Sequence, residues 1–274
     1  MDSFVRKLVI EAGRAIQALS DDRDVIEKTP NDFVTGADRR AAGLIIDQVR
    51  QAFPHDTILC EDAERAPSAS NGERIWLVDP LDGTTNFLHH YPFYAVSIGV
   101  YEQRTQRPVV SAVFAPALDQ LFEAYGDEPP RLNGRPIKVS SVRELHQALV
   151  LTGFSHRVRT ESNELTLFAA ISAGSSGTRR SGCAALDICY VAAGFADAYY
   201  HMNLEAWDMA AAAHILGNAG GRTTNIGVME FNLFHSSVLA TNGVCHDAVQ
   251  QALADGLGGR RGVPVGVSTK VPGV

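Results

Sequence analysis

Apolar residues in the first part of the chain recur at helical spacing. Residues 1–20 have apolar positions three or four apart, which predicts an amphipathic helix. The same spacing from Ala41 to Phe53 predicts a second helix, and the polar segment 27–35 separates the two. Asp38 falls in the first turn of the second helix, where the helix dipole favours a carboxylate. Taken alone, Asp38 is therefore interpreted as a helix cap.

The middle of the chain has the shorter period of β-strands. Residues 57–60 and 74–78 are apolar runs of strand length. Asp79-Pro80 is expected to end the second run, because proline cannot extend a ladder and restricts the residue before it. Residues 93–125 contain three apolar runs with short connections, which predicts an antiparallel meander. Asn133-Gly134 then indicates a hairpin turn.

The second half alternates strands and helices. The predicted order is a strand at 148–152, a helix at 161–173, a strand near 178, a helix at 183–193, a strand at 196–200, a helix at 207–218, a strand after 220–221, a strand at 238–241 and a closing helix. This alternation predicts an α/β (α+β layered) protein. We expect one domain over residues 1–255, which could comprise sub-lobes at about 1–140 and 141–255, and a disordered tail at 256–274.

Composition and charge narrow the classes of function. The chain has 274 residues, 45% hydrophobic and 20% charged, which is ordinary for a globular protein with a sizeable core. The formal net charge of −7 argues against a nucleic-acid binder that works through phosphate contacts. No apolar run approaches membrane-spanning length, and residues 1–20 lack the apolar core of a signal peptide. We expect a cytoplasmic protein with no membrane partner.

Cysteine and histidine patterns give little sign of a site. Cys60, Cys183, Cys189 and Cys245 show no C-x-x-C spacing and lie among apolar or small residues, so buried free thiols are favoured over disulfides or zinc ligands. The histidines lack the H-E-x-x-H arrangement. His89-His90 could be ligands, but supporting or surface positions are favoured.

One stretch, Trp76–Phe87, concentrates reactive side chains directly after an apolar run. Asp79 and Asp82 lie three positions apart in a segment too apolar and too rich in turn residues to be a solvated charge run. Two such carboxylates repel each other unless a cation or a proton lies between them. Metal binding is therefore the economical interpretation.

Acidic residues also lie at the ends of two other predicted elements. Glu61-Asp62 comes directly after the strand at 57–60, and Asp208 opens an alanine-rich helix. As an isolated residue, Asp208 could equally be an N-terminal acid stabilised by the helix dipole. The three acidic positions around 61, 79 and 208 become informative only together.

In these motifs the sequence resembles the inositol monophosphatase family of metal-dependent, lithium-sensitive sugar phosphatases. Two long signatures carry the resemblance: W-x-x-D-P-L-D-G-T-T-N-F at 76–87, and W-D-x-A-A at 207–211 running to A-G-G at 219–221. Shorter matches occur in the family's order at 32–38, 61–62 and 179–187. Together the motifs extend over roughly residues 1 to 255.

The resemblance implies a phosphomonoesterase with the sugar-phosphatase fold, an α/β/α/β/α sandwich, that forms a homodimer and uses two or three Mg²⁺ ions. It places one ion on Glu61, Asp79 and the Leu81 carbonyl, and a second on Asp79, Asp82 and Asp208. Asp79 would bridge the two ions. Hard oxygen ligands suit magnesium, and carboxylates gathered from separate segments would be intolerable without a cation.

The resemblance also assigns catalytic groups. Thr84, hydrogen-bonded to Asp38, corresponds to the pair that orients and helps deprotonate the attacking water. Glu61 and Asp82 would take part through the ions, one of which lowers the pKa of the water while the other polarises the leaving oxygen. The backbone N–H groups of Gly83 and Thr84 would cradle the phosphate. The alternative interpretation of Thr84 and Thr85 is a pair of helix-capping residues.

On the substrate side the resemblance is less complete. Asp82 and Asp208 would border the phosphate, and Gly182 and Cys183 would border the sugar or alcohol. His201 stands where inositol phosphatases carry a glutamate that binds substrate hydroxyls. This exchange would make the pocket more positive and open to a second phosphate or a different alcohol; the alternative for His201 is a dimer-interface or rim position. In addition, Asp62 replaces the more usual second glutamate, and its shorter reach would weaken an outer, water-mediated contact with a metal.

These features together predict Mg²⁺-dependent hydrolysis of a small phosphorylated metabolite, most simply myo-inositol 1-phosphate. Alternative substrates are fructose 1,6-bisphosphate, 3′-phosphoadenosine 5′-phosphate and histidinol phosphate. An alternative of another class is a non-catalytic regulatory or binding protein on the same fold, which the intact acidic set argues against. The G-x-S-x-G, P-loop and G-x-G-x-x-G patterns are absent from the sequence.

Overall fold

The computed structural model describes residues 1–20, 24–29, 32–61, 73–155 and 163–258. Its α-helices are α1 (Asp2–Gln17), α2 (Gly36–Ala52), α3 (Thr84–Leu88), α4 (Asn163–Gly174), α5 (Ala184–Ala192), α6 (Ala206–Asn218) and α7 (His246–Gly256). Its strands are β1 (Val25–Thr29), β2 (Asp32–Thr35), β3 (Thr57–Cys60), β4 (Arg74–Asp82), β5 (Ala95–Glu102), β6 (Pro108–Ala115), β7 (Gln120–Tyr125), β8 (Arg131–Leu132), β9 (Arg135–Pro136), β10 (Leu149–Thr152), β11 (Gly177–Arg179), β12 (Ala198–His201), β13 (Arg222–Thr224) and β14 (Val238–Thr241). A short 3₁₀ helix, η1, covers Leu145–Gln147.

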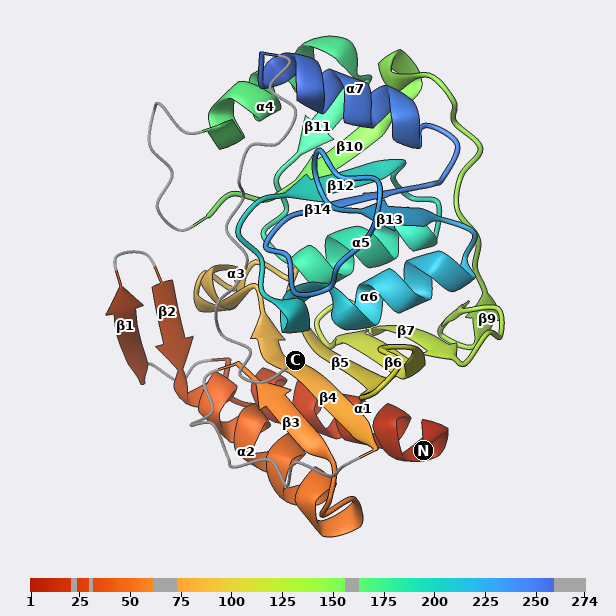
Figure 1. Ribbon diagram of the computed structural model, residues 1–274. Coiled ribbons are helices and arrows are strands. Elements are labelled where there is room, and N and C mark those ends of the chain that lie inside the picture. Colours follow the sequence, from red (N-terminus) through yellow and green to blue (C-terminus); the bar gives the residue numbers. More distant parts are fainter. Residues whose placement is uncertain (21–23, 30–31, 62–72, 156–162, 259–274) are drawn as a thin grey trace.

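Five layers stack on one another (Figure 1). Helices α1 and α2 cover one face of a seven-stranded sheet with the order β3-β4-β5-β6-β7-β8-β9. Helices α5 and α6 cover its other face and separate it from a five-stranded sheet with the order β11-β10-β12-β14-β13. Helices α4 and α7 close the far side of the second sheet. The predicted α/β/α/β/α sandwich is therefore confirmed.

Strand β4 shows how the alternation of side chains builds two cores. Trp76 and Val78 pack in the core that includes α1 and α2, whereas Ile75 and Leu77 pack in the core that includes α5 and α6. Side chains two positions apart lie on the same face of a strand. The next residue on the face of Leu77 is Asp79, so the strand directs this carboxylate toward the layer of α5 and α6.

The prediction that Asp79-Pro80 ends this strand is wrong. Strand β4 continues to Asp82, with an irregular register: Asp79 pairs with Ser97 of β5, and Asp82 pairs with Ala95. Three steps along β4 thus correspond to two steps along β5, which is the pattern of a β-bulge. Pro80 is tolerated because it lies within the bulge, where the regular ladder is interrupted.

Most other predicted elements are confirmed. The antiparallel meander of β5, β6 and β7 is present, and Asn133 and Gly134 take the positive φ angles of 50° and 78° that a tight hairpin requires. The hairpin of β1 and β2 is not among the predicted elements, since most of it lies in the polar segment 27–35. Most of the tail expected to be disordered, residues 259–274, lies outside the described residues. No helix in the described part of the chain combines the length and apolar character needed to cross a bilayer.

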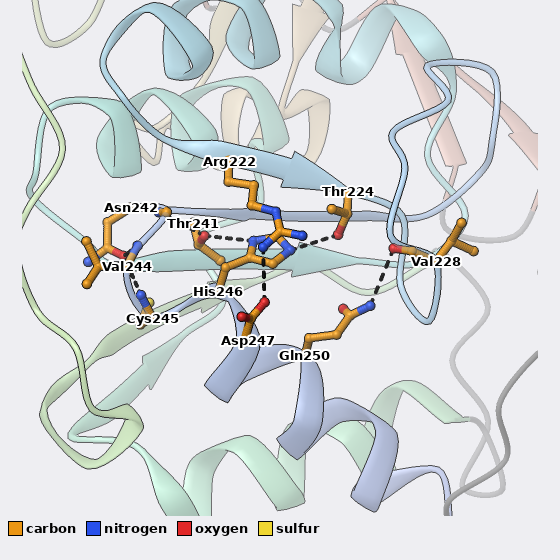
Figure 2. Close-up of polar contacts among 11 residues, drawn as sticks. Arg222, Thr224, Val228, Thr241, Asn242, Val244, Cys245, His246, Asp247 and Gln250 are labelled. Carbon is orange, nitrogen blue, oxygen red and sulfur yellow. Dashed lines mark hydrogen bonds and ion pairs between the residues drawn. The ribbon is translucent and has the colours of Figure 1, made fainter.

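Helix α7 is fixed to the second sheet by a buried histidine (Figure 2). The ring nitrogens of His246 lie 2.9 Å from Thr241 Oγ1 and 3.1 Å from Thr224 Oγ1, and Arg222 donates to Asp247 at 3.0 Å. Burial, together with the nearby Arg222 charge, lowers the pKa of His246 to about 4. His246 is therefore neutral at pH 7, with both nitrogens satisfied by hydroxyl groups.

Candidate active site

Three carboxylates converge at the end of strand β4. Glu61, Asp79 and Asp208 each offer an oxygen atom, and these atoms all lie within 4.8 Å of one another. The fold explains two of them, because β3 and β4 are parallel neighbours with Cys60 opposite Val78. The next residues along the two chains, Glu61 just after β3 and Asp79 within β4, therefore lie near each other, and the Glu61 N–H donates to the Val78 carbonyl at 3.0 Å.

Helix α6 supplies the third carboxylate. Asp208 lies in its first turn and accepts a hydrogen bond from the Glu205 N–H at 2.8 Å, as part of a capping box. The helix can approach the sheet closely because β5 has a glycine beneath it: a Cβ atom on Gly99 would lie 3.0 Å from the Ala211 backbone nitrogen. The helix-acid interpretation of Asp208 is thus confirmed, and the same residue also joins the acidic cluster.

Asp82 reaches a different helix. Its Oδ2 atom accepts a hydrogen bond from the Ala185 N–H at 2.6 Å, at the N-terminus of α5. The Cys183 thiol, on the N-cap residue of that helix, also donates to Asp82. A carboxylate is favoured at this position by the unpaired N–H groups and by the helix dipole.

Burial and mutual repulsion destabilise the ionised forms of these carboxyl groups. Burial, and then the charges of Glu61, Asp82 and Asp208, raise the pKa of Asp79 well above its usual value. The pKa of Asp208 is raised by burial and by the Glu61 and Asp82 charges, and burial raises the pKa of Asp82 to about 6 against the opposing effect of the α5 hydrogen bonds. Ionised carboxylates in this setting are stabilised by a bound cation.

The residues present fit a hard divalent cation. All the converging side chains are oxygen donors from Asp and Glu, which is the ligand type of Mg²⁺ and Ca²⁺. Ser97, opposite Asp79 in the ladder, is fully buried, and its hydroxyl has no hydrogen-bond partner among the described residues. A buried hydroxyl without a partner, next to the central carboxylate Asp79, is expected at a site that a bound ion or its water ligands complete.

Thr84 and Asp38 lie together beside the cluster. Thr84 Oγ1 lies 3.3 Å from Asp38 Oδ1 and 3.1 Å from the Leu81 carbonyl oxygen, so its single proton is shared between two acceptors. The other oxygen of Asp38 accepts from the Thr35 N–H at 2.7 Å and from the Thr35 hydroxyl at 2.5 Å. Asp38 is therefore both the cap of α2 and a partner of Thr84.

The alternative of a threonine capping pair is wrong. The N-cap of α3 is Gly83, with φ of 91°, and no side chain makes a capping hydrogen bond there. The hydroxyl of Thr84 instead turns back toward the end of β4.

The expected substrate-side residues come from the ends of other elements. Gly182, with φ of 88°, and Cys183 precede α5. His201 ends β12, is 7% exposed, and stacks on Tyr199 with a centroid distance of 6.3 Å. A Cβ atom on Gly153 would lie 2.1 Å from the His201 ring, so this imidazole lies directly against the backbone at the end of β10.

Some contacts at the site have no sequence signal. Ser97 is identified only by its register opposite Asp79, and the Asp82 contact with Ala185 joins residues 103 positions apart. Asp62, expected to make an outer contact with a metal, lies outside the described residues.

Comparison with known proteins agrees with this geometry. A model of the inositol monophosphatase family matches residues 1–257. The inositol-1-monophosphatase of Synechocystis is 39% identical over 224 residues, which are 81% of this chain and 77% of that protein. The Nus factor SuhB of Pseudomonas aeruginosa is 38% identical over 242 residues, 86% of this chain and 88% of that protein.

Solved structures extend the similarity to the fold. The inositol monophosphatase of Anabaena superposes with a TM-score of 0.82 at 32% identity, over 92% of this chain and 96% of that chain. The SuhB protein of Bartonella henselae gives a TM-score of 0.84 at 34% identity, over 90% and 95% of the two chains. Because the family match runs from the first residue to the end of α7 and the fold superposes closely on these structures, the chain belongs to the inositol monophosphatase family and is a phosphoric monoester hydrolase.

Proposed function

We propose that the protein hydrolyses a small phosphate monoester with the help of Mg²⁺, most simply myo-inositol 1-phosphate. The observation that carries this proposal is the convergence of Glu61, Asp79 and Asp208 within 4.8 Å, beside the paired Thr84 and Asp38. Convergent acids alone would suit many metal sites. A hydroxyl backed by an anchored carboxylate adds a group that can accept a proton from water.

The acidic groups would hold the metal. Glu61, Asp79 and the Leu81 carbonyl would bind one ion, and Asp79 with Asp82 and Asp208 would bind a second. When bound, such ions activate a water molecule and stabilise negative charge on the phosphate and the leaving oxygen. Asp82 is oriented for this task by the Ala185 N–H, and Asp208 by the Glu205 N–H.

Thr84 and Asp38 would take the proton. Thr35 fixes Asp38 through its backbone N–H and its hydroxyl, which leaves Oδ1 for Thr84. When the Thr84 hydroxyl donates to Asp38, its own lone pairs are free to accept a proton from the attacking water. The proton would move from water to Thr84 Oγ1 as the threonine proton moves to Asp38 Oδ1, and the backbone N–H groups of Gly83 and Thr84 would bind the phosphate.

The substrate alcohol would lie against Gly182, Cys183 and His201. A histidine offers one donor and one acceptor when neutral, whereas the glutamate of inositol phosphatases offers only acceptors. Because of this difference, phosphate esters other than inositol phosphate are candidate substrates, including one with a second phosphate group. The homodimer and the lithium sensitivity implied by the resemblance stay predictions, as does the cytoplasmic location expected from the sequence.

The deciding experiment measures phosphate release with Mg²⁺ from a panel comprising myo-inositol 1-phosphate, fructose 1,6-bisphosphate, 3′-phosphoadenosine 5′-phosphate and histidinol phosphate. We expect turnover of at least one substrate that stops when Mg²⁺ is chelated, and a shift in relative kcat/KM toward inositol phosphate in His201→Glu. Absence of turnover with every substrate, while Mg²⁺ still binds, would favour the non-catalytic alternative. Unchanged substrate preference in His201→Glu would remove this residue from the substrate pocket.

A further inference from the structure

We propose that Asp187 is a positioning residue that keeps two turns of the active site in contact through Ser181 and Asn86. The first turn, here called the cradle turn, is Gly83–Asn86. The second, the wall turn, is Arg180–Cys183. The inference rests on the proposed function because these turns carry the expected phosphate and alcohol contacts, but the bonds that support it are independent of that function.

The two turns lie in close contact at two glycines. A Cβ atom on Gly83 would lie 3.2 Å from the Gly182 carbonyl oxygen and 3.3 Å from the Cys183 Cβ. A Cβ atom on Gly182 would lie 3.1 Å from the Asn86 amide nitrogen. Both glycines also have positive φ angles, 91° and 88°, which other residues rarely adopt. The two turns therefore pack together without room for a side-chain carbon at either glycine.

Asn86 connects the turns directly. Its side-chain amide nitrogen donates to the Phe93 carbonyl at 2.7 Å and to the Ser181 carbonyl at 2.8 Å. An amide NH₂ group has two donors, and both are used here. The wall turn is thus attached to the middle of α3 through the backbone carbonyl of Ser181.

Asp187 fixes the other side of Ser181. The Ser181 hydroxyl donates to Asp187 Oδ1 at 2.6 Å. Asp187 lies in the first turn of α5 and is 1% exposed. The same helix end binds Asp82 through the Ala185 N–H. One short helix segment therefore holds both Asp82, a proposed metal ligand, and the wall turn.

The surroundings of Asp187 favour a neutral acceptor. Its Oδ2 atom is buried and has no hydrogen-bond partner in the described part of the chain. Burial, and next the Asp82 charge, raise the pKa of Asp187 well above its usual value, against the Ser181 hydrogen bond. A bare, buried carboxylate oxygen is unfavourable when charged. A neutral carboxyl still accepts from Ser181 and adds no negative charge beside Asp82, so an asparagine could do the same.

The kinetic test compares Asp187→Asn, Asp187→Leu and Ser181→Ala with the wild type, using the best phosphate ester of the panel with Mg²⁺. We expect Asp187→Leu and Ser181→Ala to lower kcat/KM about tenfold, chiefly through KM, and Asp187→Asn to stay within about threefold. Combining Asp187→Leu with Ser181→Ala should add little, because both remove the same contact.

A matched control separates positioning from stability. Val191 is fully buried on α5, two turns from the site, and Val191→Ala should lower the unfolding temperature while leaving kcat/KM unchanged. Wild-type kcat/KM in Asp187→Leu, at a temperature where it is folded, would overturn the proposal. Equal losses in Asp187→Asn and Asp187→Leu would overturn the neutral-acceptor role.

Amide hydrogen exchange provides a readout that does not require activity. In Asp187→Leu we expect exchange at residues 181–185 and 83–87 to become about tenfold faster, with wild-type exchange in Asp187→Asn. If the wild type hydrolyses no ester of the panel, the proposed function fails, and this exchange experiment alone decides the positioning role. Unchanged exchange in both turns would then overturn it.

Discussion

Asp82 Oδ2 and the Ala185 N–H are joined by a 2.6 Å hydrogen bond across 103 positions of sequence. This bond connects the end of strand β4 with the first turn of helix α5. It orients one oxygen of Asp82 toward the helix and so restricts where the rest of the carboxylate can lie. A side chain at this position thus serves the helix directly, and under the proposed function it would also bind a metal ion.

Replacing Asp82 separates these two roles. Asp82→Asn keeps an oxygen for the Ala185 N–H but removes the charge that would hold a metal. We expect a folded protein whose kcat falls at least about a hundredfold, as expected for loss of a metal-binding group. The measurement is Mg²⁺-dependent phosphate release, with circular dichroism to verify folding. Asp255→Asn, at an exposed end of α7, is the matched control and should be fully active. Full Mg²⁺-dependent turnover in Asp82→Asn would refute the metal assignment.

Thr84 tests the proton path. Its hydroxyl lies between Asp38 Oδ1 and the Leu81 carbonyl oxygen. Thr84→Ala should lower kcat about a hundredfold with little change in KM, whereas Thr84→Ser should recover most of the activity because it keeps the hydroxyl. Steady-state kinetics of both variants decide the point. Equal activity of Thr84→Ala and the wild type would exclude the hydroxyl from catalysis.

Ser97 has opposite expected effects with and without metal. Its buried hydroxyl lacks a partner among the described residues, so Ser97→Ala should raise the stability of the metal-free protein by about 1 kcal/mol. If the hydroxyl supports Asp79 when a cation is bound, the same variant should weaken Mg²⁺ binding about tenfold. Thermal unfolding in EDTA and in Mg²⁺ measures both effects. Identical changes under the two conditions would show that Ser97 does not act on the metal.

His246 predicts a loss of stability in acid. Its pKa in the folded protein is about 4, below the usual 6.5, so the unfolded chain binds the extra proton first as the pH falls. The neutral histidine therefore contributes fully above about pH 6.5, and this contribution is lost as the pH falls toward 4. The full shift corresponds to about 3 kcal/mol.

The comparison with His246→Gln isolates this effect from the titration of the carboxylates. The wild type should lose stability relative to the variant between about pH 6.5 and 4, as measured by urea unfolding at several pH values. A stability difference that does not change with pH would contradict the lowered pKa.

The sequence predicts the layers well because each layer has its own period. Helical spacing marks α1 and α2, strand runs mark the meander, and alternation marks the second sheet. The hairpin of β1 and β2 escapes prediction because its segment is polar, and a half-exposed two-stranded sheet leaves little apolar pattern. Pro80 misleads for a different reason, since a bulge accepts a proline that a regular ladder would not.

The acidic residues of the site can be predicted from the sequence, whereas the residues that hold them in place cannot. Asp79 and Asp82 are visible because acidic residues are rare beside an apolar run, Glu61 and Asp208 because they adjoin a predicted strand and a predicted helix, and the motif resemblance joins the four. The bond from Ser181 to Asp187 and the register of Ser97 with Asp79 depend on tertiary packing. No local spacing encodes such contacts, so only the folded structure reveals them.

The bulge in β4 gives this site an unusual sensitivity to chain length. Asp79 and Asp82 are three residues apart but oppose positions two apart on β5. Deleting Pro80 or Leu81 would restore an even count and return β4 to regular pairing, with the acids two positions apart on one face. Substitutions can be absorbed by neighbouring side chains, whereas insertions and deletions alter the direction of a ligand. We therefore expect related sequences to differ at this strand end by substitution, with the number of residues between Asp79 and Asp82 unchanged.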